Sequence, residues 1–170
     1  MQGRKCTDYD ICRDCSPPAA GEAADVNCVA VEHTKYYITD HYKVKGADKM
    51  MAELNAHGPI SCGVHATDLF ETTYNKIVEG EGDYIFRENV KIPKINHEIS
   101  VVGYGVDATT GEGYWKARNS WGTYWGDYGF FYLPMGKAST NLGIETDCVA
   151  GIPSYTQAAE AKLEALMFFQ

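Results

Sequence analysis

The sequence predicts an α+β fold that consists mostly of an antiparallel barrel or open sheet with one main helix. Short apolar runs recur along the second half of the chain, and glycine-containing turns separate them. In the main body, a strong helical pattern occurs once. Glycine (17) and tyrosine (12) are plentiful among the 170 residues, which favours turn-rich β structure. The length suits one domain or one lobe of a larger domain.

The first 45 residues are predicted to form an irregular loop followed by one or two strands. Residues 1–30 are expected to form a cysteine-rich loop, because Pro17, Pro18 and an alanine-rich stretch oppose helices and strands. Residues 31–45 alternate apolar and polar side chains, which predicts one or two strands.

The main helix is predicted over residues 47–57. Met50, Met51 and Leu54 form its apolar face, and Gly58 with Pro59 ends it. Residues 60–65 are then predicted to form a buried strand.

The remaining segments alternate between irregular stretches and strands. An irregular segment is expected at 67–95, and a helical tail at 158–170 is expected to follow the folded body. Strands are predicted at about 97–106, 113–119 and 128–133. The chain therefore divides into three predicted parts: the loop 1–30, a body at 31–154, and an appended tail at 155–170.

The charge and the cysteines exclude several classes of function. A net charge of −8 and a pI near 5.0 argue against nucleic-acid and anionic-membrane partners. No apolar run is long enough to span a bilayer, and no secretory signal follows Met1. Four of the six cysteines fall in the first 28 residues, which favours a disulfide-stapled loop. A zinc site at Cys12 and Cys15 is the alternative, although no second pair of ligands follows.

Three residues carry the chemistry that the sequence suggests. His97 opens a run that is predicted to be a central buried strand, so a rigid element would place its imidazole as a base. Asn119 ends the next strand, and its amide could orient that imidazole without adding charge. Trp121 could cover the pair and exclude water. Separately, these residues suit a strand histidine, a turn asparagine and a core tryptophan, but their order favours a catalytic site.

The motifs around these residues resemble the C-terminal half of a papain-family cysteine peptidase. The residues that carry this resemblance are Asn96-His97, Val101-Val102-Gly103-Tyr104-Gly105, Tyr114-Trp115, Arg118-Asn119-Ser120-Trp121-Gly122, Trp125-Gly126 and Gly129-Phe130. Segment 49–63, the cysteine-rich start and segment 141–148 are similar to a lysosomal carboxypeptidase branch of that family. The resemblance covers about residues 5–154.

The resemblance implies a papain-like fold in which this chain is mostly the barrel (right) lobe and the helical left lobe is largely missing. It implies His97 as the catalytic histidine, Asn119 as its orienting partner, and Trp121 as a shield that also contacts the substrate. It also implies disulfides Cys15–Cys28 and Cys62–Cys148, and leaves the pairing of Cys6 and Cys12 open. Peptide or protein substrates, a complementary N-terminal lobe as partner, and a lysosomal or extracellular location follow from it. No cofactor or metal is implied.

The nucleophile of the family is missing from this sequence. In the family a cysteine precedes a tryptophan, with an oxyanion-hole glutamine upstream, and none of the six cysteines here is followed by Trp. The glutamines, at 2, 157 and 170, lie near the ends. Because a triad nucleophile supplies most of a rate gain of about 10⁶-fold, we expect the chain to be inactive by itself. The alternative is a non-catalytic interaction module derived from a peptidase.

Glu98 is a second departure, because the family has a small or apolar residue after the histidine. A carboxylate that bends toward His97 would favour the charged imidazole, whereas one on the opposite face of the strand would not affect it.

Overall fold

The computed structural model describes residues 7–16, 27–32, 36–79 and 84–154. The chain forms two compact units, Met1–Tyr37 with Ser154–Gln170, and Ile38–Pro153. The predicted helix at 158–170 and Cys6 lie outside the described residues. No helix among the described residues has the length and apolar character needed to cross a membrane.

The smaller unit contains regular structure where a loop was predicted. A short helix α1 (Asp8–Ile11) precedes two antiparallel strands, β1 (Arg13–Ser16) and β2 (Asn27–Ala30). Cys15 lies directly opposite Cys28 in this ladder, and a disulfide joins them. The prediction of an irregular 1–30 segment is therefore wrong for these elements, because a covalent cross-link stabilises a ribbon that local propensity does not favour.

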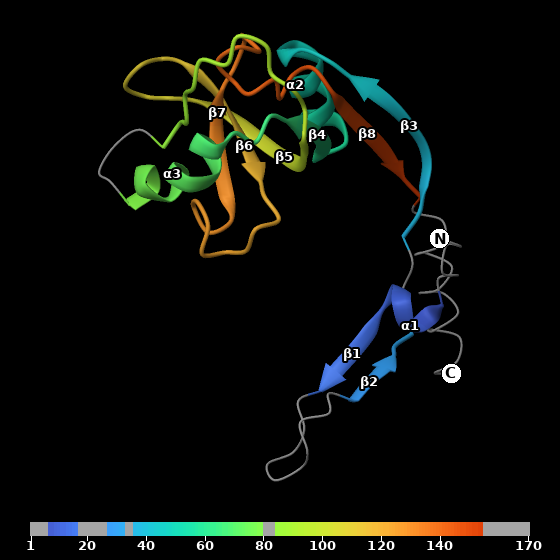
Figure 1. Ribbon diagram of the computed structural model, residues 1–170. Helices are drawn as coiled ribbons and strands as arrows, with labels where there is room; N and C mark the ends of the chain where they lie inside the picture. The colour runs from blue at the N-terminus through green and yellow to red at the C-terminus, as the bar shows by residue number, and fades with distance from the viewer. Residues whose placement is uncertain (1–6, 17–26, 33–35, 80–83, 155–170) are drawn as a thin grey trace. The chain divides into compact units, whose positions relative to one another are not determined.

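The larger unit is built on one open, antiparallel six-stranded sheet (Figure 1). Its strand order is β3-β8-β4-β5-β6-β7, so that β3 and β7 are the edges and no barrel closes. The strands are β3 (Ile38–Val44), β4 (Ile60–Val64), β5 (His97–Val106), β6 (Gly113–Arg118), β7 (Phe130–Pro134) and β8 (Cys148–Pro153). The helices are α2 (Ala47–Ala56) and α3 (Asp68–Glu79).

The strand predictions around the candidate site agree closely with the structure. The predicted strands at 97–106 and 113–119 correspond to β5 and β6, and that at 128–133 corresponds to β7. The main helix ends at Ala56, just before Gly58, whose φ of +98° suits glycine. The strand β8, paired with β3 and β4, was not predicted.

Helix α3 lies in the segment that was predicted to be irregular. The Thr67 hydroxyl accepts a hydrogen bond from the Phe70 backbone N–H, as an N-cap does. Phe70 and Tyr74, one turn apart, are both fully buried. Their rings contact Phe131 of β7 and Trp125, so packing with distant residues stabilises this helix. The predicted α+β fold with a mostly antiparallel sheet and few helices is confirmed, whereas the prediction of an irregular segment at 67–95 is wrong over Asp68–Glu79, where a second helix forms in the body.

A disulfide fixes the middle of the sheet. Cys62 of β4 and Cys148 of β8 lie opposite each other and are bonded, and both are fully buried. Next to Cys62, the core-facing side chains Ile60 and Val64 are buried as well. This rigid sheet carries the start of β5, which holds His97.

Candidate active site

His97 lies at the boundary between the core and the surface. It is the first residue of β5 and pairs with Val64 of β4. Val64 is fully buried and His97 is half-buried, so the ring leaves the core at the end of a central strand. Asn96 anchors this point, because its amide bonds both the N–H (2.8 Å) and the carbonyl (3.0 Å) of Ala66. The sequence reasoning missed Asn96 as an anchor, although an asparagine at the start of a strand was a visible signal.

The imidazole of His97 is held by Asn119. The His97 Nε2 and Asn119 Oδ1 atoms are 2.8 Å apart. The backbone N–H of Ser120 also donates to that Oδ1 atom at 2.8 Å, which requires an oxygen there and fixes the orientation of the amide. Because an amide oxygen can only accept, Nε2 of the neutral ring carries the proton and Nδ1 carries the lone pair.

Asn119 is in turn fixed by its backbone and its burial. It follows β6 directly, and its N–H donates to the Gly129 carbonyl at 2.8 Å. It is 7% exposed, and within the described residues its Nδ2 atom has no hydrogen-bond partner. The side chain is therefore held through Oδ1, the atom that faces the histidine.

Trp121 covers the pair. Its ring stacks on the His97 ring with centroids 4.8 Å apart and an interplanar angle of 27°. The edge of Trp125 supports Trp121 from another side at 4.8 Å, and Phe70 of α3 lies 6.1 Å away. An aromatic face against the His97 ring lowers the local dielectric around the imidazole and excludes water from that side.

Glu98 does not reach His97. Side chains alternate along β5, so Glu98 lies on the opposite, exposed face of the strand. Its Oε2 atom accepts a hydrogen bond from the Ser61 hydroxyl at 3.3 Å. Of the two geometries considered from the sequence, the structure has the one in which the carboxylate lies on the face of the strand opposite His97.

Within the larger unit, no described cysteine has a free thiol. Cys62 and Cys148 form a disulfide, as do Cys15 and Cys28, which are the pairs implied by the family resemblance. Cys12 is free and belongs to the smaller unit. The disulfide at Cys15 removes a ligand from the alternative zinc site. In the described part of the chain, no group of three His, Cys, Asp or Glu residues could hold a metal.

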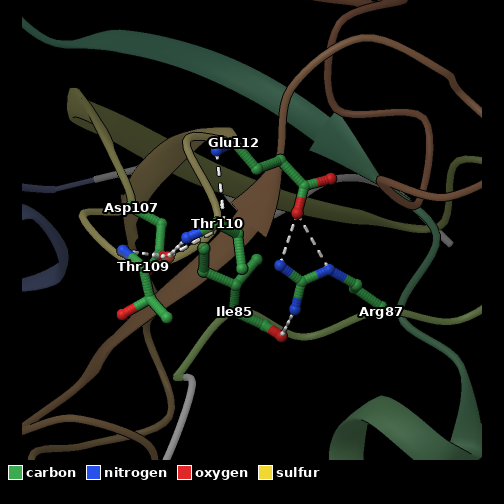
Figure 2. Close-up of polar contacts among 6 residues, drawn as sticks. All are labelled: Ile85, Arg87, Asp107, Thr109, Thr110 and Glu112. Atoms are coloured by element: carbon green, nitrogen blue, oxygen red, sulfur yellow. Dashed lines mark hydrogen bonds and ion pairs between the residues drawn. The ribbon is translucent and has the colours of Figure 1, made fainter.

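A polar network stabilises the turn that connects β5 to β6 (Figure 2). The Asp107 Oδ1 atom accepts from the N–H groups of Thr109 (3.0 Å) and Thr110 (2.6 Å) and from the Thr110 hydroxyl. These bonds from Thr110 hold the pKa of Asp107 below its usual value. Nearby, Arg87 pairs with Glu112. The network fixes one end of a hairpin whose other end places His97 and Asn119.

Comparisons with known proteins show the family of the chain. The model of the papain family cysteine protease matches residues 5–152. Cathepsin Z of Onchocerca volvulus is 38% identical over 154 residues, which is 87% of this chain and 45% of that protein. Cathepsin C of Schistosoma mansoni is 30% identical over 162 residues, which is 88% of this chain and 35% of that protein. The chain thus spans less than half the length of these curated relatives.

Solved structures share the fold. The bromelain protease from Ananas comosus, solved in complex with the E64 inhibitor, is 27% identical with a TM-score of 0.55, covering 68% of this chain and 51% of that chain. Procathepsin L 3 from the larval midgut of Tenebrio molitor has a TM-score of 0.53 at 24% identity, covering 68% of this chain and 35% of that chain. The second likeness supports the fold alone.

Proposed function

Because the chain belongs to the papain family of cysteine proteases, we propose that it supplies the base half of a cysteine-peptidase active site. His97 is the general base, Asn119 orients it, and Trp121 shields the pair and borders the leaving side of the substrate. The observation that carries this proposal is the 2.8 Å contact between His97 Nε2 and Asn119 Oδ1 beneath a stacked tryptophan. That contact leaves Nδ1 as the basic atom of the ring.

The proposed chemistry follows from this tautomer. Nδ1 of His97 takes the proton of a cysteine thiol, which yields a thiolate beside an imidazolium. The thiolate attacks the carbonyl carbon of a peptide bond, and the imidazolium returns its proton to the departing amine. His97 then takes a proton from water, whose oxygen attacks the thioester; the thiol is regenerated and the acid product leaves. Asn119 keeps Nε2–H bonded throughout, so the ring does not turn away from the reacting atoms.

The thiol and the oxyanion-hole glutamine are proposed to come from a complementary N-terminal lobe. Residues 31–154 form the C-terminal peptidase lobe in this proposal, 1–30 the end of the neighbouring lobe, and 155–170 an appended tail. The disulfides Cys15–Cys28 and Cys62–Cys148 suit the lysosomal or extracellular location of the proposed peptidase. The chain by itself is expected to lack peptidase activity.

Reconstitution tests the proposal. The purified chain is mixed with the N-terminal lobe of the Onchocerca volvulus cathepsin Z, and hydrolysis of a fluorogenic peptide is followed. We expect turnover from the mixture, none from either part, and a loss of at least about 10³-fold with His97→Ala. Alkylation of the added lobe with iodoacetamide should abolish turnover.

Two outcomes would contradict the proposal. Turnover by the unmixed chain that iodoacetamide abolishes would show that a cysteine of this sequence can act as nucleophile. A stable complex of the two lobes without turnover would favour the non-catalytic interaction module instead. Size-exclusion chromatography of the mixture separates that second outcome from a simple failure of the lobes to associate.

A further inference from the structure

A second site candidate shares no residue with the His97–Asn119 pair. It is an open pocket of about 560 Å³, within the size range of pockets that bind small groups. Its lining includes one carboxylate and, among the described residues, no basic side chain. The lining residues are Tyr84, Thr123, Gly126, Asp127, Tyr128 and Tyr132.

Tyrosines make up half of the residues that line this pocket. Three of the six lining residues are tyrosines, of which Tyr84 is 47% and Tyr128 is 80% exposed. Aromatic rings carry partial negative charge on their faces and therefore attract cations. Exposed aromatic rings gain little free energy from contact with water. A ligand that covers the rings of Tyr84 and Tyr128 would therefore stabilise them in this position.

The backbone of Tyr128 is strained. Its φ is +50°, a conformation that bulky residues other than glycine rarely adopt. Burial of the ring does not explain why a tyrosine is present, because the side chain is mostly exposed. Strain of this kind concentrates at ligand sites, where the side chain itself is needed.

The carboxylate of Asp127 belongs to the pocket lining, and a hydrogen bond fixes one of its oxygens. Its Oδ2 atom accepts a hydrogen bond from the Tyr132 hydroxyl at 2.7 Å, and its backbone N–H and carbonyl both bond Phe130. Within the described residues, no hydrogen bond or ion pair reaches its Oδ1 atom. A fixed, negatively charged oxygen beside aromatic faces is suited to a cation that can also donate hydrogen bonds.

A lysine of the same chain, Lys116, lies near this pocket. The Nζ atom of Lys116 is 4.9 Å from the ring centroid of Phe130 and 5.6 Å from that of Tyr132. Lys116 does not line the pocket, and no cation among the described residues lies over Tyr84 or Tyr128. These two rings and Asp127 therefore remain available.

We propose that this pocket binds the guanidinium group of an arginine side chain from a peptide or protein partner. The guanidinium plane stacks on the exposed tyrosine faces, and its N–H groups donate to Asp127. The net charge of −8 on the chain favours the approach of such a basic partner. The inference does not depend on peptidase activity.

Titration by NMR with a matched pair of ligands tests the proposal. The probes are N-acetyl-arginine amide and N-acetyl-citrulline amide, which have nearly the same shape but differ in charge. We expect the backbone amide signals of residues 123–128 to shift with the arginine compound, at about tenfold lower concentration than with the citrulline compound. Asp127→Asn should remove this preference while it preserves the size of the side chain.

Two further variants distinguish the contribution of the Tyr128 ring to binding from an effect on folding. Tyr128→Asn removes the aromatic face, and asparagine tolerates the positive φ, so the variant should fold and bind arginine at least about threefold more weakly. Tyr124→Asn is the control, because Tyr124 is 89% exposed and does not line the pocket. Equal binding of arginine and citrulline, no loss in Asp127→Asn, or binding of methyl α-glucoside without binding of arginine would overturn the proposal.

Discussion

The Asn119→Ala substitution tests whether Asn119 holds the ring of His97 or mainly holds the fold. The substitution removes the acceptor of two hydrogen bonds, from His97 Nε2–H and from the Ser120 N–H. Each such bond contributes about 0.5–1.5 kcal/mol, or roughly 1–3 kcal/mol together. The substitution also removes the buried Nδ2 atom, which has no partner among the described residues and whose desolvation costs about 1–3 kcal/mol.

These two contributions have opposite signs and similar sizes. We therefore expect the free energy of unfolding to change by less than about 2 kcal/mol, as measured by urea denaturation. The ring of His97 should respond strongly, because Nε2–H loses the acceptor that selects its tautomer. Nitrogen-15 NMR of the imidazole at about pH 8, where an ordinary histidine is neutral, should show Nε2–H in the wild type and a tautomer mixture in the variant.

Asn55→Ala is the matched control, because Asn55 is exposed and, among the described residues, its side chain bonds only Tyr104. It should leave both the stability and the His97 spectrum unchanged. The reasoning fails if Asn119→Ala loses more than about 3 kcal/mol while the Nε2–H tautomer persists. That result would make Asn119 a structural residue of the β6–β7 connection.

Two further predictions concern buried and surface carboxylates. Glu145 is 8% exposed, and its Oε1 atom accepts from Trp115 Nε1, the Gly136 N–H and Asn141 Nδ2. Glu145→Ala leaves three donors unpaired and should lower the free energy of unfolding in urea by more than about 3 kcal/mol. Glu145→Gln keeps an acceptor and should lower it by about half as much. Equal losses in the two variants would contradict this account. Hydrogen bonds from Thr110 hold the pKa of Asp107 below its usual value of about 3.9. Its ionised form therefore stabilises the fold above that pH, and this contribution is lost as the pH falls through the lower pKa of the folded state. The difference in Tm between wild type and Asp107→Ala should therefore shrink as the pH falls below about 3.9, and a constant difference from pH 6 to pH 2 would exclude the mechanism.

Local patterns predicted the hairpin that carries the site. The apolar run of β5, the turn that begins at Asp107 and the alternation in β6 are all visible in the sequence, and each element forms with its neighbour in the chain. Helix α3 could not be found in the same way. Polar residues separate its buried Phe70 from Tyr74, and the partners Trp125 and Phe131 lie far along the chain. Strand β8 likewise depends on distant partners, β3 and β4.

The order of His97, Asn119 and Trp121 in the sequence suggested a catalytic site. The sequence could not predict the tautomer of His97 or the orientation of the Asn119 amide. Which ring nitrogen of His97 carries the proton follows from the orientation of the Asn119 amide. A single backbone donor, the Ser120 N–H, fixes that orientation. No sequence pattern encodes such a choice, because it depends on the path of the chain after β6.

One continuous stretch of sequence organises the proposed base half of the site. His97 begins β5, Asn119 follows β6, and Trp121 lies in the loop after it, so the hairpin and its following loop place all three groups. Their mutual contacts, the 2.8 Å hydrogen bond and the ring stack, involve residues of this stretch alone. A base that is already oriented needs no rearrangement when a thiol arrives, which is the condition for efficient proton transfer. The proposed division of the active site between two lobes is therefore physically reasonable, since the parts that require the finest alignment lie on the same lobe.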